Sequence, residues 1–246
     1  KKKELGNSIT FAGIQSIIKK VTDLSHFDLA IIDEAHLINH NNEGRYRELL
    51  NNLKIKKPSL KIIGLTATPY RLDHGLITDW PAIFDELLEP VSIGELLEGG
   101  YLSALESQIT KNKLEVDGVR KIGGDYVVSE LQKKVNTTDK NEKIVQEVIQ
   151  LAGGRRHWLF FFVGVSHAQA VAEQLNKCGV SAACIVGETP MTERENILFN
   201  FKSGKIKALT NANVLTTGFD YPDIDLIAMM RPTLSPGLYV QMAGRG

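Results

Sequence analysis

The chain has 246 residues, carries 29 basic and 29 acidic side chains, and is 43% hydrophobic, a mix that is typical of a globular protein and excludes wholesale disorder. Dividing the chain at residue 115 gives two halves of nearly balanced charge, so neither half is a basic module. Bulk charge therefore gives no argument for nucleic-acid binding and none against a local basic groove.

The cysteines and the apolar segments exclude several further classes. The two cysteines, Cys178 and Cys184, form no CxxC pair and no zinc-type spacing, and we interpret both as buried structural thiols. The longest strongly apolar run, residues 158–165, is far shorter than the ~20 residues of a membrane helix. No apolar segment follows the N-terminal lysines as in a signal peptide. We therefore expect a cytoplasmic protein without a membrane span.

The first part of the chain predicts alternating strands and helices. Strands are expected at residues 8–12, 29–32 and 61–65, and helices at 14–20, over the helically spaced apolar residues 46–53, and from Ser92 to the glycine pair at 99–100. Residues 29–32 are apolar without a break, which predicts a strand buried on both faces.

The second part of the chain repeats this alternation of strands and helices after a segment of different amino-acid composition. Residues 111–136 mix charge, glycine and valine, which indicates an inter-domain connection with room for a strand or hairpin. Strands follow at 158–163, 181–186, 206–210 and 225–229, and capping boxes are expected at Asp139/Glu142, Ser166/Gln169 and Thr192/Glu195. Pro236 suits the first position of a last helix. Alternation with apolar strands predicts an α/β fold with parallel sheets covered by helices.

The sharpest chemical motif is the acidic pair Asp33 and Glu34, followed by Ala35 and His36, directly after the strand at 29–32. Ligands of open α/β sheets bind at the carboxyl ends of the strands. Phosphoryl transfer requires one carboxylate that holds magnesium and a second polar group that orients the attacking water. The pair after an apolar strand favours this function over an ordinary acidic loop.

Three weaker motifs accompany the acidic pair. Thr66 and Thr68 follow the next strand, where their hydroxyls can bond the carboxylates. Gly218 and Asp220 follow a strand of the second half. Gln241 and Arg245 are four residues apart on one helix face or just past its end, and an arginine there suits a phosphate clamp, although a solvated arginine is the commoner case.

Together, DEAH, TAT, TTGFD and QMAGRG stand in the order of superfamily 2 helicases and translocases, which the chain resembles over nearly its whole length. The stretches FAGIQSI, IIDEAHLINHNNEGRYRELL, GLTATPYRLDHG, FFVGVSHA and ALTNANVLTTGFDYPDIDLIAMMRPT are similar to the bacterial RadD-like DNA-repair helicases. The resemblance implies two RecA-like lobes, the first at 1–115 and truncated at its start, a linker at 116–136, and a second lobe at 137–246, truncated at its end.

The same resemblance implies a role for each motif residue. Asp33 would hold Mg²⁺ through water and Glu34 would activate the attacking water, while His36, Thr66 and Thr68 would couple the lobes. Gly218 and Asp220 would contact ATP, Gln241 would face His36, and Arg245 would be an arginine finger. The implied nucleic-acid contacts are Gly13, Gln15, Ser16, Gly164, Ser166, Thr189 and Thr210. Small and hydroxyl residues suit phosphate contacts made through backbone N–H groups and hydroxyls.

The chain departs from the family pattern at one important place. It contains no Gly-x-x-x-x-Gly-Lys-Ser/Thr: Gly204 and Lys205 are followed by Ile206, and no glycine stands at 199. Because the chain does not start with Met and ends inside a segment that we predict to be structured, we expect a fragment whose phosphate-binding loop precedes Lys1. We expect the 246 residues alone to be inactive and the intact parent to be an ATP- and Mg²⁺-dependent helicase in repair or recombination, with DNA rather than RNA as the expected substrate. A single-strand-binding or repair protein is an expected partner through other regions.

The sequence offers four alternatives to a helicase. Gly164 to Ala168 looks like a hydrolase nucleophile elbow, but no histidine follows an acid after Ser166. His36 and His40 have the spacing of paired zinc ligands, but Leu37 stands where zincins have Glu. A restriction-enzyme motor subunit shares the helicase motifs. A non-hydrolysing scaffold needs neither Glu34 nor Arg245, which argues against it.

Overall fold

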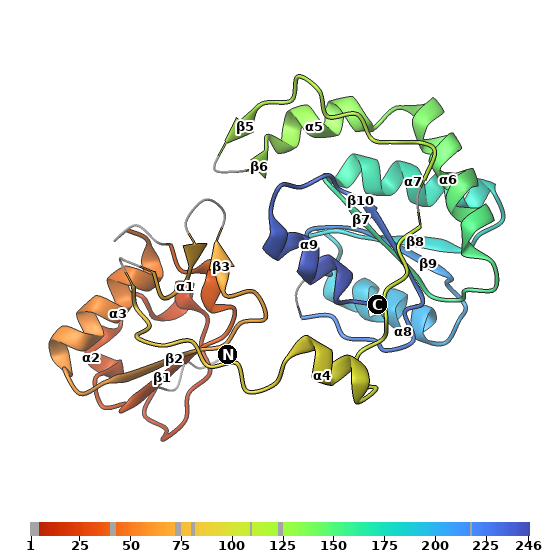
Figure 1. Cartoon of the computed structure of the whole chain (residues 1–246). Coiled ribbons are helices and arrows are strands. Elements are labelled where there is room, and N and C mark those ends of the chain that lie inside the picture. The colour runs from red at the N-terminus through yellow and green to blue at the C-terminus, as the bar shows by residue number, and fades with distance from the viewer. Residues whose placement is uncertain are drawn as a thin grey trace. The chain divides into compact units, whose positions relative to one another are not determined.

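The computed structural model describes residues 5–39, 43–71, 75–79, 82–108, 110–122, 125–216 and 218–246. The chain forms two compact α/β units, Lys1–Pro90 and Val91–Gly246 (Figure 1). The division lies ahead of the expected linker at 116–136, so residues 91–136 group with the second unit. No helix in the described segments is long and apolar enough to cross a membrane.

Unit 1 is built on a two-stranded parallel sheet. Strand β1 (Leu29–Ile32) pairs with β2 (Lys61–Gly64), and Leu29 lies opposite Lys61. The other elements are α1 (Ile14–Ile17), α2 (Val21–Leu24), a 3-10 turn (Ala35–Leu37), α3 (Arg45–Lys56) and the short antiparallel pair β3 (Tyr70–Arg71) and β4 (Gly75–Leu76). The predicted helix with Leu49, Leu50 and Leu53 on its buried face is confirmed as α3.

Two sequence predictions for unit 1 are wrong. Residues 8–12 form no strand, and Phe11 is 97% exposed because nothing in the described structure packs on it. Strand β1 is not buried on both faces, since Ile31 is 61% exposed. Within the described part of the unit, β1 pairs only with β2, so an apolar sequence is left partly open on one face.

Unit 2 contains a four-stranded parallel sheet in the order β10-β7-β9-β8. Its strands are β7 (Trp158–Phe162), β8 (Ala182–Ile185), β9 (Ala208–Ala212) and β10 (Leu226–Met230). Its covering helices are α6 (Thr138–Ala152), α7 (Val165–Lys177), α8 (Met191–Lys202) and α9 (Pro236–Ala243). Pro236 is the first residue of α9, as predicted. Strand β9 begins two residues later than expected.

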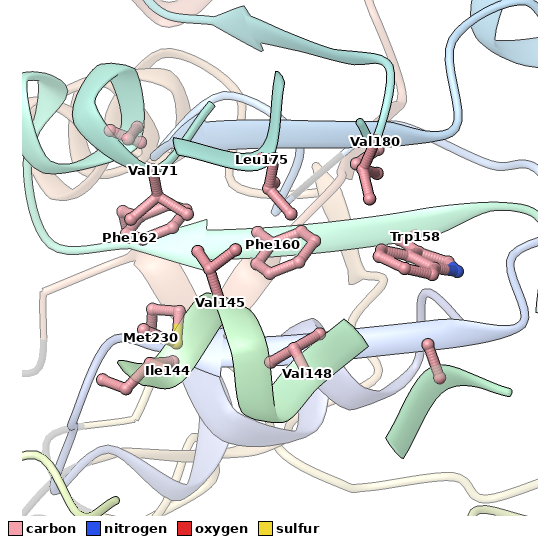
Figure 2. Close-up of a cluster of buried hydrophobic side chains, with 14 residues drawn as sticks. Ile144, Val145, Val148, Trp158, Phe160, Phe162, Val171, Leu175, Val180 and Met230 are labelled. Atoms are coloured by element: carbon pink, nitrogen blue, oxygen red, sulfur yellow. The ribbon is translucent and has the colours of Figure 1, made fainter. Parts of the chain in front are cut away.

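Every residue of β7 is buried, and alternate side chains enter opposite cores. Phe160 and Phe162 pack with Val145 of α6 and with Val171 of α7 (Figure 2). Leu159 and Phe161 pack on the other face with Phe201 of α8 and Met242 of α9. Helices thus cover both faces of the central strand, which explains its uninterrupted apolar sequence.

The segment before α6 is more structured than a linker. Helix α4 (Ile93–Glu98) begins with the capping box of Ser92 and Glu95. Strands β5 (Lys121–Ile122) and β6 (Asp125–Tyr126) form an antiparallel pair, where the sequence indicated room for a strand or hairpin. Helix α5 (Val128–Val135) was not predicted, because its mixed charge masked the apolar face of Leu131 and Val135.

The three capping boxes predicted in the second half do not form. Helices α6, α7 and α8 begin earlier, with Thr137, Gly164 and Pro190 at their N-caps and no side-chain cap bond. The serine of the second box, Ser166, instead accepts hydrogen bonds from Gln132 of α5 and from Asn136 at the C-cap of α5. The cysteine interpretation is half wrong: Cys184 is partly buried, which raises the pKa of its thiol, whereas Cys178 is exposed.

Candidate active site

The acidic pair and the Thr66–Thr68 turn lie at the same edge of the unit 1 sheet. The Leu65 N–H donates to the Ile32 carbonyl over 2.8 Å, and the Ala35 N–H donates to the Leu65 carbonyl over 2.9 Å. The pairing of β1 with β2 therefore continues into both loops. This brings Asp33 and Glu34 beside the turn after β2, as parallel pairing predicts.

The backbone at Glu34 is in the left-handed region, with φ of 51°. A non-glycine residue seldom adopts this conformation, and such strain concentrates at functional sites. The Glu34 N–H donates to Asp33 Oδ1 over 3.0 Å, which orients the first carboxylate. The chain thus turns sharply between the two acidic side chains.

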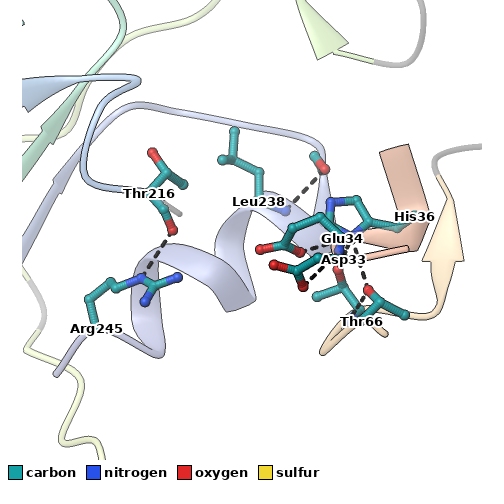
Figure 3. A network of polar contacts seen from close by, with 9 residues as sticks. Asp33, Glu34, His36, Thr66, Thr216, Leu238 and Arg245 are labelled. Carbon is teal, nitrogen blue, oxygen red and sulfur yellow. Dashed lines mark hydrogen bonds and ion pairs between the residues drawn. The ribbon is translucent and has the colours of Figure 1, made fainter. Parts of the chain in front are cut away.

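His36 connects the acidic pair with the threonine turn (Figure 3). Its Nδ1 lies 2.9 Å from Thr66 Oγ1, 3.3 Å from Thr68 Oγ1 and 3.4 Å from Glu34 Oε2. The Thr68 N–H donates to Thr66 Oγ1 over 3.0 Å, and Thr68 is buried. His36 therefore contacts Glu34, Thr66 and Thr68, and so links the loop after β1 to the loop after β2.

The packing below this site also involves Gly64 and Phe84, which the motifs did not indicate. Ala35 is fully buried, and a Cβ at Gly64 would lie 2.5 Å from the Phe84 ring and 2.7 Å from the Ala35 Cβ. Gly64 is thus required by close packing below the acidic pair. A glycine at the end of a strand, before a polar turn, was the available signal for this close approach.

In unit 2, Arg245 is bound to the loop that contains Gly218 and Asp220. Its Nε donates to the Thr216 carbonyl over 3.0 Å and its Nη1 to the Phe219 carbonyl over 2.7 Å (Figure 3 draws the first of these). Gly218 has φ of 69°, which favours glycine, and Asp220 is exposed. Gln241 is half-buried on α9. The Arg245 guanidinium therefore has a visible structural role, and its role as a finger stays a prediction.

The predicted nucleic-acid contacts differ in exposure. Gly13, Gln15 and Ser16 are exposed at the start of α1, and Thr189 accepts the Val186 N–H over 3.0 Å. Thr210 is wrong as a contact: it is fully buried in β9, and its hydroxyl donates to the Ala168 carbonyl over 2.9 Å.

Gly164 and Ser166 lie under helix α5, which the sequence did not place there. Gly164 is buried, and the exposed Ser166 hydroxyl oxygen accepts from Gln132 Nε2 and, over 3.4 Å, from Asn136 Nδ2. Any nucleic acid at Ser166 would therefore also meet α5.

The described structure gives little support to the alternatives of a metal site and a hydrolase. No group of three His, Cys, Asp or Glu that could hold a metal occurs among the described residues, and His40 lies outside them. His167, next to Ser166, is fully buried, and burial lowers its pKa to about 4. Asp33 is an exposed single carboxylate, which fits Mg²⁺ because this ion keeps several waters and is held by one or two carboxylates and substrate phosphates.

Comparisons with known proteins match both parts of the chain. Residues 1–71 match the family model of the type III restriction enzyme res subunit, and residues 139–246 match that of the helicase conserved C-terminal domain. The chain is 30% identical to the putative ATP-dependent helicase IRC3 of Saccharomyces cerevisiae over 248 residues, covering 98% of this chain and 35% of that protein. It is 32% identical to the putative mitochondrial ATP-dependent helicase irc3 of Schizosaccharomyces pombe, covering 90% of this chain and 36% of that protein.

The chain therefore spans about a third of the length of these curated relatives. Among solved structures, it is similar to the Mycobacterium smegmatis helicase Lhr bound to ssDNA and AMP-PNP, with a TM-score of 0.58 and 17% identity, over 95% of this chain and 29% of that one. This likeness shows the fold: parallel-sheet lobes of the RecA-like helicase type, as the sequence predicted.

Proposed function

Because the chain belongs to the superfamily 2 helicases, we propose that it forms part of an ATP-dependent helicase or translocase that acts on DNA. The observation that carries the proposal is the contact of His36 with Glu34, Thr66 and Thr68 at the sheet edge. A nucleotide-independent scaffold would need no strained acidic pair tied to a second loop. The 246 residues hold no phosphate-binding loop motif, so we propose that they do not hydrolyse ATP alone.

The acidic pair would divide two tasks. Asp33 would hold Mg²⁺ through water, and the ion when bound would neutralise charge on the ATP phosphates. Glu34 would orient the attacking water and accept its proton. The His36 contact at 3.4 Å would keep the Glu34 carboxylate in place and would transmit its position to the Thr66–Thr68 turn.

Unit 2 would supply the remaining groups. Gly218 and Asp220 would contact the nucleotide, Gln241 would act from α9, and Arg245 would act from the residues just after α9. An arginine stabilises the transferring phosphoryl group only when it reaches it, so nucleic acid that favours closure of the lobes would stimulate hydrolysis by a population shift. The backbone carbonyls that bind Arg245 would hold its guanidinium ready for that contact.

DNA is favoured over RNA by the RadD-like stretches, and a role in repair or recombination is proposed on the same basis. A restriction-enzyme motor is the second candidate, because residues 1–71 match the res subunit model. A nuclease domain in the intact protein would favour that candidate.

The proposal is tested by ATP turnover of the intact protein, with its phosphate-binding loop, in the presence of single-stranded DNA, RNA of the same length, or neither. We expect Mg²⁺-dependent turnover that DNA stimulates more than RNA does. Turnover that neither polymer changes would contradict the assignment as a nucleic-acid motor. Stimulation by RNA alone would contradict DNA as the substrate.

A further inference from the structure

The edge at which the strands of the unit 2 sheet begin carries a hollow of about 380 Å³, which we call the basal hollow. Its volume is within the ~300–1,000 Å³ of typical ligand pockets. It lies between Arg156 and Lys207, just before β7 and β9, and Lys202 at the end of α8. Ser166 and Gly218 instead follow the ends of β7 and β9. Because the strands are parallel, the basal hollow lies at the opposite edge of the sheet from these candidate site residues.

Three cationic side chains of the basal hollow have no acidic partner. Among the described residues, Arg156, Lys202 and Lys207 form no ion pair with a carboxylate. The one carboxylate in the described lining is that of Asp223, whose Oδ2 lies 3.0 Å from the Tyr221 hydroxyl. Three cations against one carboxylate leave an excess of positive charge, so the hollow attracts an anionic group.

Aromatic rings orient two of these cations. Lys202 Nζ lies 5.4 Å from the centre of the Tyr221 ring, and Lys207 Nζ lies 4.6 Å from the centre of a ring of Trp158. An ammonium group at such a distance is attracted by the negative face of the ring. Tyr221 itself packs edge-on against His157, with 5.1 Å between ring centres. The ammonium groups are therefore directed by the packed side chains around the hollow.

The basal hollow also contains acceptors, and these decide which kind of anion suits it. Asp223 belongs to its lining, and so do Ser203 and Gly204 at the C-terminal end of α8, which is the negative end of the helix dipole. A nucleic-acid backbone has a negative phosphate at every nucleotide and no N–H donor, so these acceptors disfavour it. An acidic peptide has carboxylates for the cations and main-chain N–H groups for the acceptors.

We propose that the basal hollow binds an acidic peptide segment of a partner protein. The Arg156 guanidinium would bind a carboxylate of the peptide, because its fork of N–H donors matches the two carboxylate oxygens. Lys202 and Lys207 would pair with neighbouring carboxylates, and Asp223 would accept a main-chain N–H. This partner site goes beyond the proposed function. Because it lies at the opposite edge of the sheet, the bound segment would leave Ser166 and Gly218 uncovered.

The test is a fluorescence-anisotropy titration of a labelled octapeptide of alternating aspartate and glycine with the full chain at low salt. Lys202→Glu is compared with Lys143→Glu, an equal charge change at an exposed position of α6 outside the hollow. We expect Lys202→Glu to weaken peptide binding roughly tenfold, because it replaces an attraction by a repulsion. Lys143→Glu should change affinity less than about twofold.

Thermal unfolding checks that both variants fold, and Lys202→Gln, which only removes the charge, serves if Lys202→Glu does not fold. We expect Lys202→Gln to weaken binding roughly threefold. Equal weakening by the variants at 202 and 143, or no binding of the peptide by the unsubstituted chain, would overturn the basal hollow as a peptide site.

A second peptide tests whether the main chain is recognised. It has sarcosine in place of each glycine, so it keeps every charge and lacks the N–H groups at those positions. We expect it to bind at least about threefold more weakly, because the acceptors of the hollow lose their donors. Equal binding of the two peptides would overturn peptide recognition in favour of charge alone.

Two competitors distinguish the other anions. Oligo(dT) should displace the peptide no better than sodium chloride of equal ionic strength does, and inorganic phosphate likewise. Stronger displacement by oligo(dT) would assign the basal hollow to nucleic acid, and stronger displacement by phosphate would assign it to a phosphate group. Either result would overturn the proposal. ATP turnover of the intact protein does not enter this test, so its failure would leave the proposed function standing.

Discussion

The two parallel sheets in the described part of the chain share a sequence pattern but differ in how deeply their strands are buried. Strand β7 of unit 2 is buried along its whole length between helices on both faces, whereas β1 of unit 1 leaves Ile31 61% exposed. The candidate hydrolytic residues lie at the end of the more open strand. Hydrogen bonds between two loops, at His36 and Thr66, hold them together with the close packing of Ala35 and Gly64.

This difference separates two kinds of effect. Changes in the loops of unit 1 should alter chemistry with little effect on folding, while changes in the core of unit 2 should destabilise the fold. Arg245 is the informative exception, because it lies in unit 2 and has both a structural contact and a proposed catalytic role.

The largest expected effect concerns Arg245. In the intact protein, Arg245→Ala should retain near-normal nucleotide affinity and lose DNA-stimulated turnover by ~10³-fold or more, the scale of a lost arginine finger. Steady-state turnover and nucleotide binding measure this, with Arg245→Lys as a matched variant that keeps the charge. Stimulated turnover that survives in a thermally weakened protein would show that Arg245 only holds the Thr216 and Phe219 carbonyls.

Phe160→Ala and Ile31→Ala test the difference in burial between β7 and β1. Phe160 is fully buried in β7, so its truncation should reduce the free energy of unfolding by ~3–5 kcal/mol. Ile31 is 61% exposed, so its truncation should cost within about 0.5 kcal/mol. Urea unfolding of the chain measures both. A comparable cost for Ile31 would mean that the open face of β1 is covered in solution.

His167 predicts a pH dependence that belongs to unit 2. Burial lowers its folded pKa to about 4 from 6.5, so the unfolded chain binds the proton more readily between these values. The contribution of neutral His167 to the free energy of unfolding should be fully present above pH 6.5. It should decrease as the pH drops towards 4, by roughly 3 kcal/mol at most. Denaturation at pH 7 and pH 5 measures this in the chain and in His167→Gln. An unchanged pH dependence in the variant would assign the effect to other groups.

A smaller effect is expected at Asp125. Its carboxylate accepts from Thr233 Oγ1 over 2.7 Å and from the Leu234 N–H over 2.9 Å, and so ties the β5–β6 hairpin to the residues before α9. Asp125→Ala should lower the stability of unit 2 by about 1 kcal/mol. The control is Asp117→Ala, at an exposed position of the same segment. Equal shifts in melting temperature for Asp125→Ala and Asp117→Ala would show that the hydrogen bonds of Asp125 do not stabilise unit 2.

Sequence reasoning located the parts of the molecule that have strong local signals. Apolar runs marked β1 and β7, and the motifs at the two strand ends marked the acidic pair and the Thr66–Thr68 turn as neighbours. The sequence predicted bonds from the threonine hydroxyls to the carboxylates, whereas in the structure both hydroxyls contact His36. It missed α5, whose charged residues hide a short apolar face, and it misassigned Thr210, because a hydroxyl in a buried strand looks the same as an exposed one. It overstated the burial of β1, since burial depends on neighbouring elements that a strand sequence does not contain.

The central claim is that the acidic pair after β1 is a hydrolytic site. The most direct measurement is ATP turnover of Glu34→Gln in the intact protein, with Mg²⁺-nucleotide binding followed in parallel. The account predicts nearly unchanged binding and turnover reduced by ~10²-fold or more, the scale of a lost general base. Near-normal turnover in this variant would contradict the assignment of Glu34 and, with it, the proposed chemistry of the site.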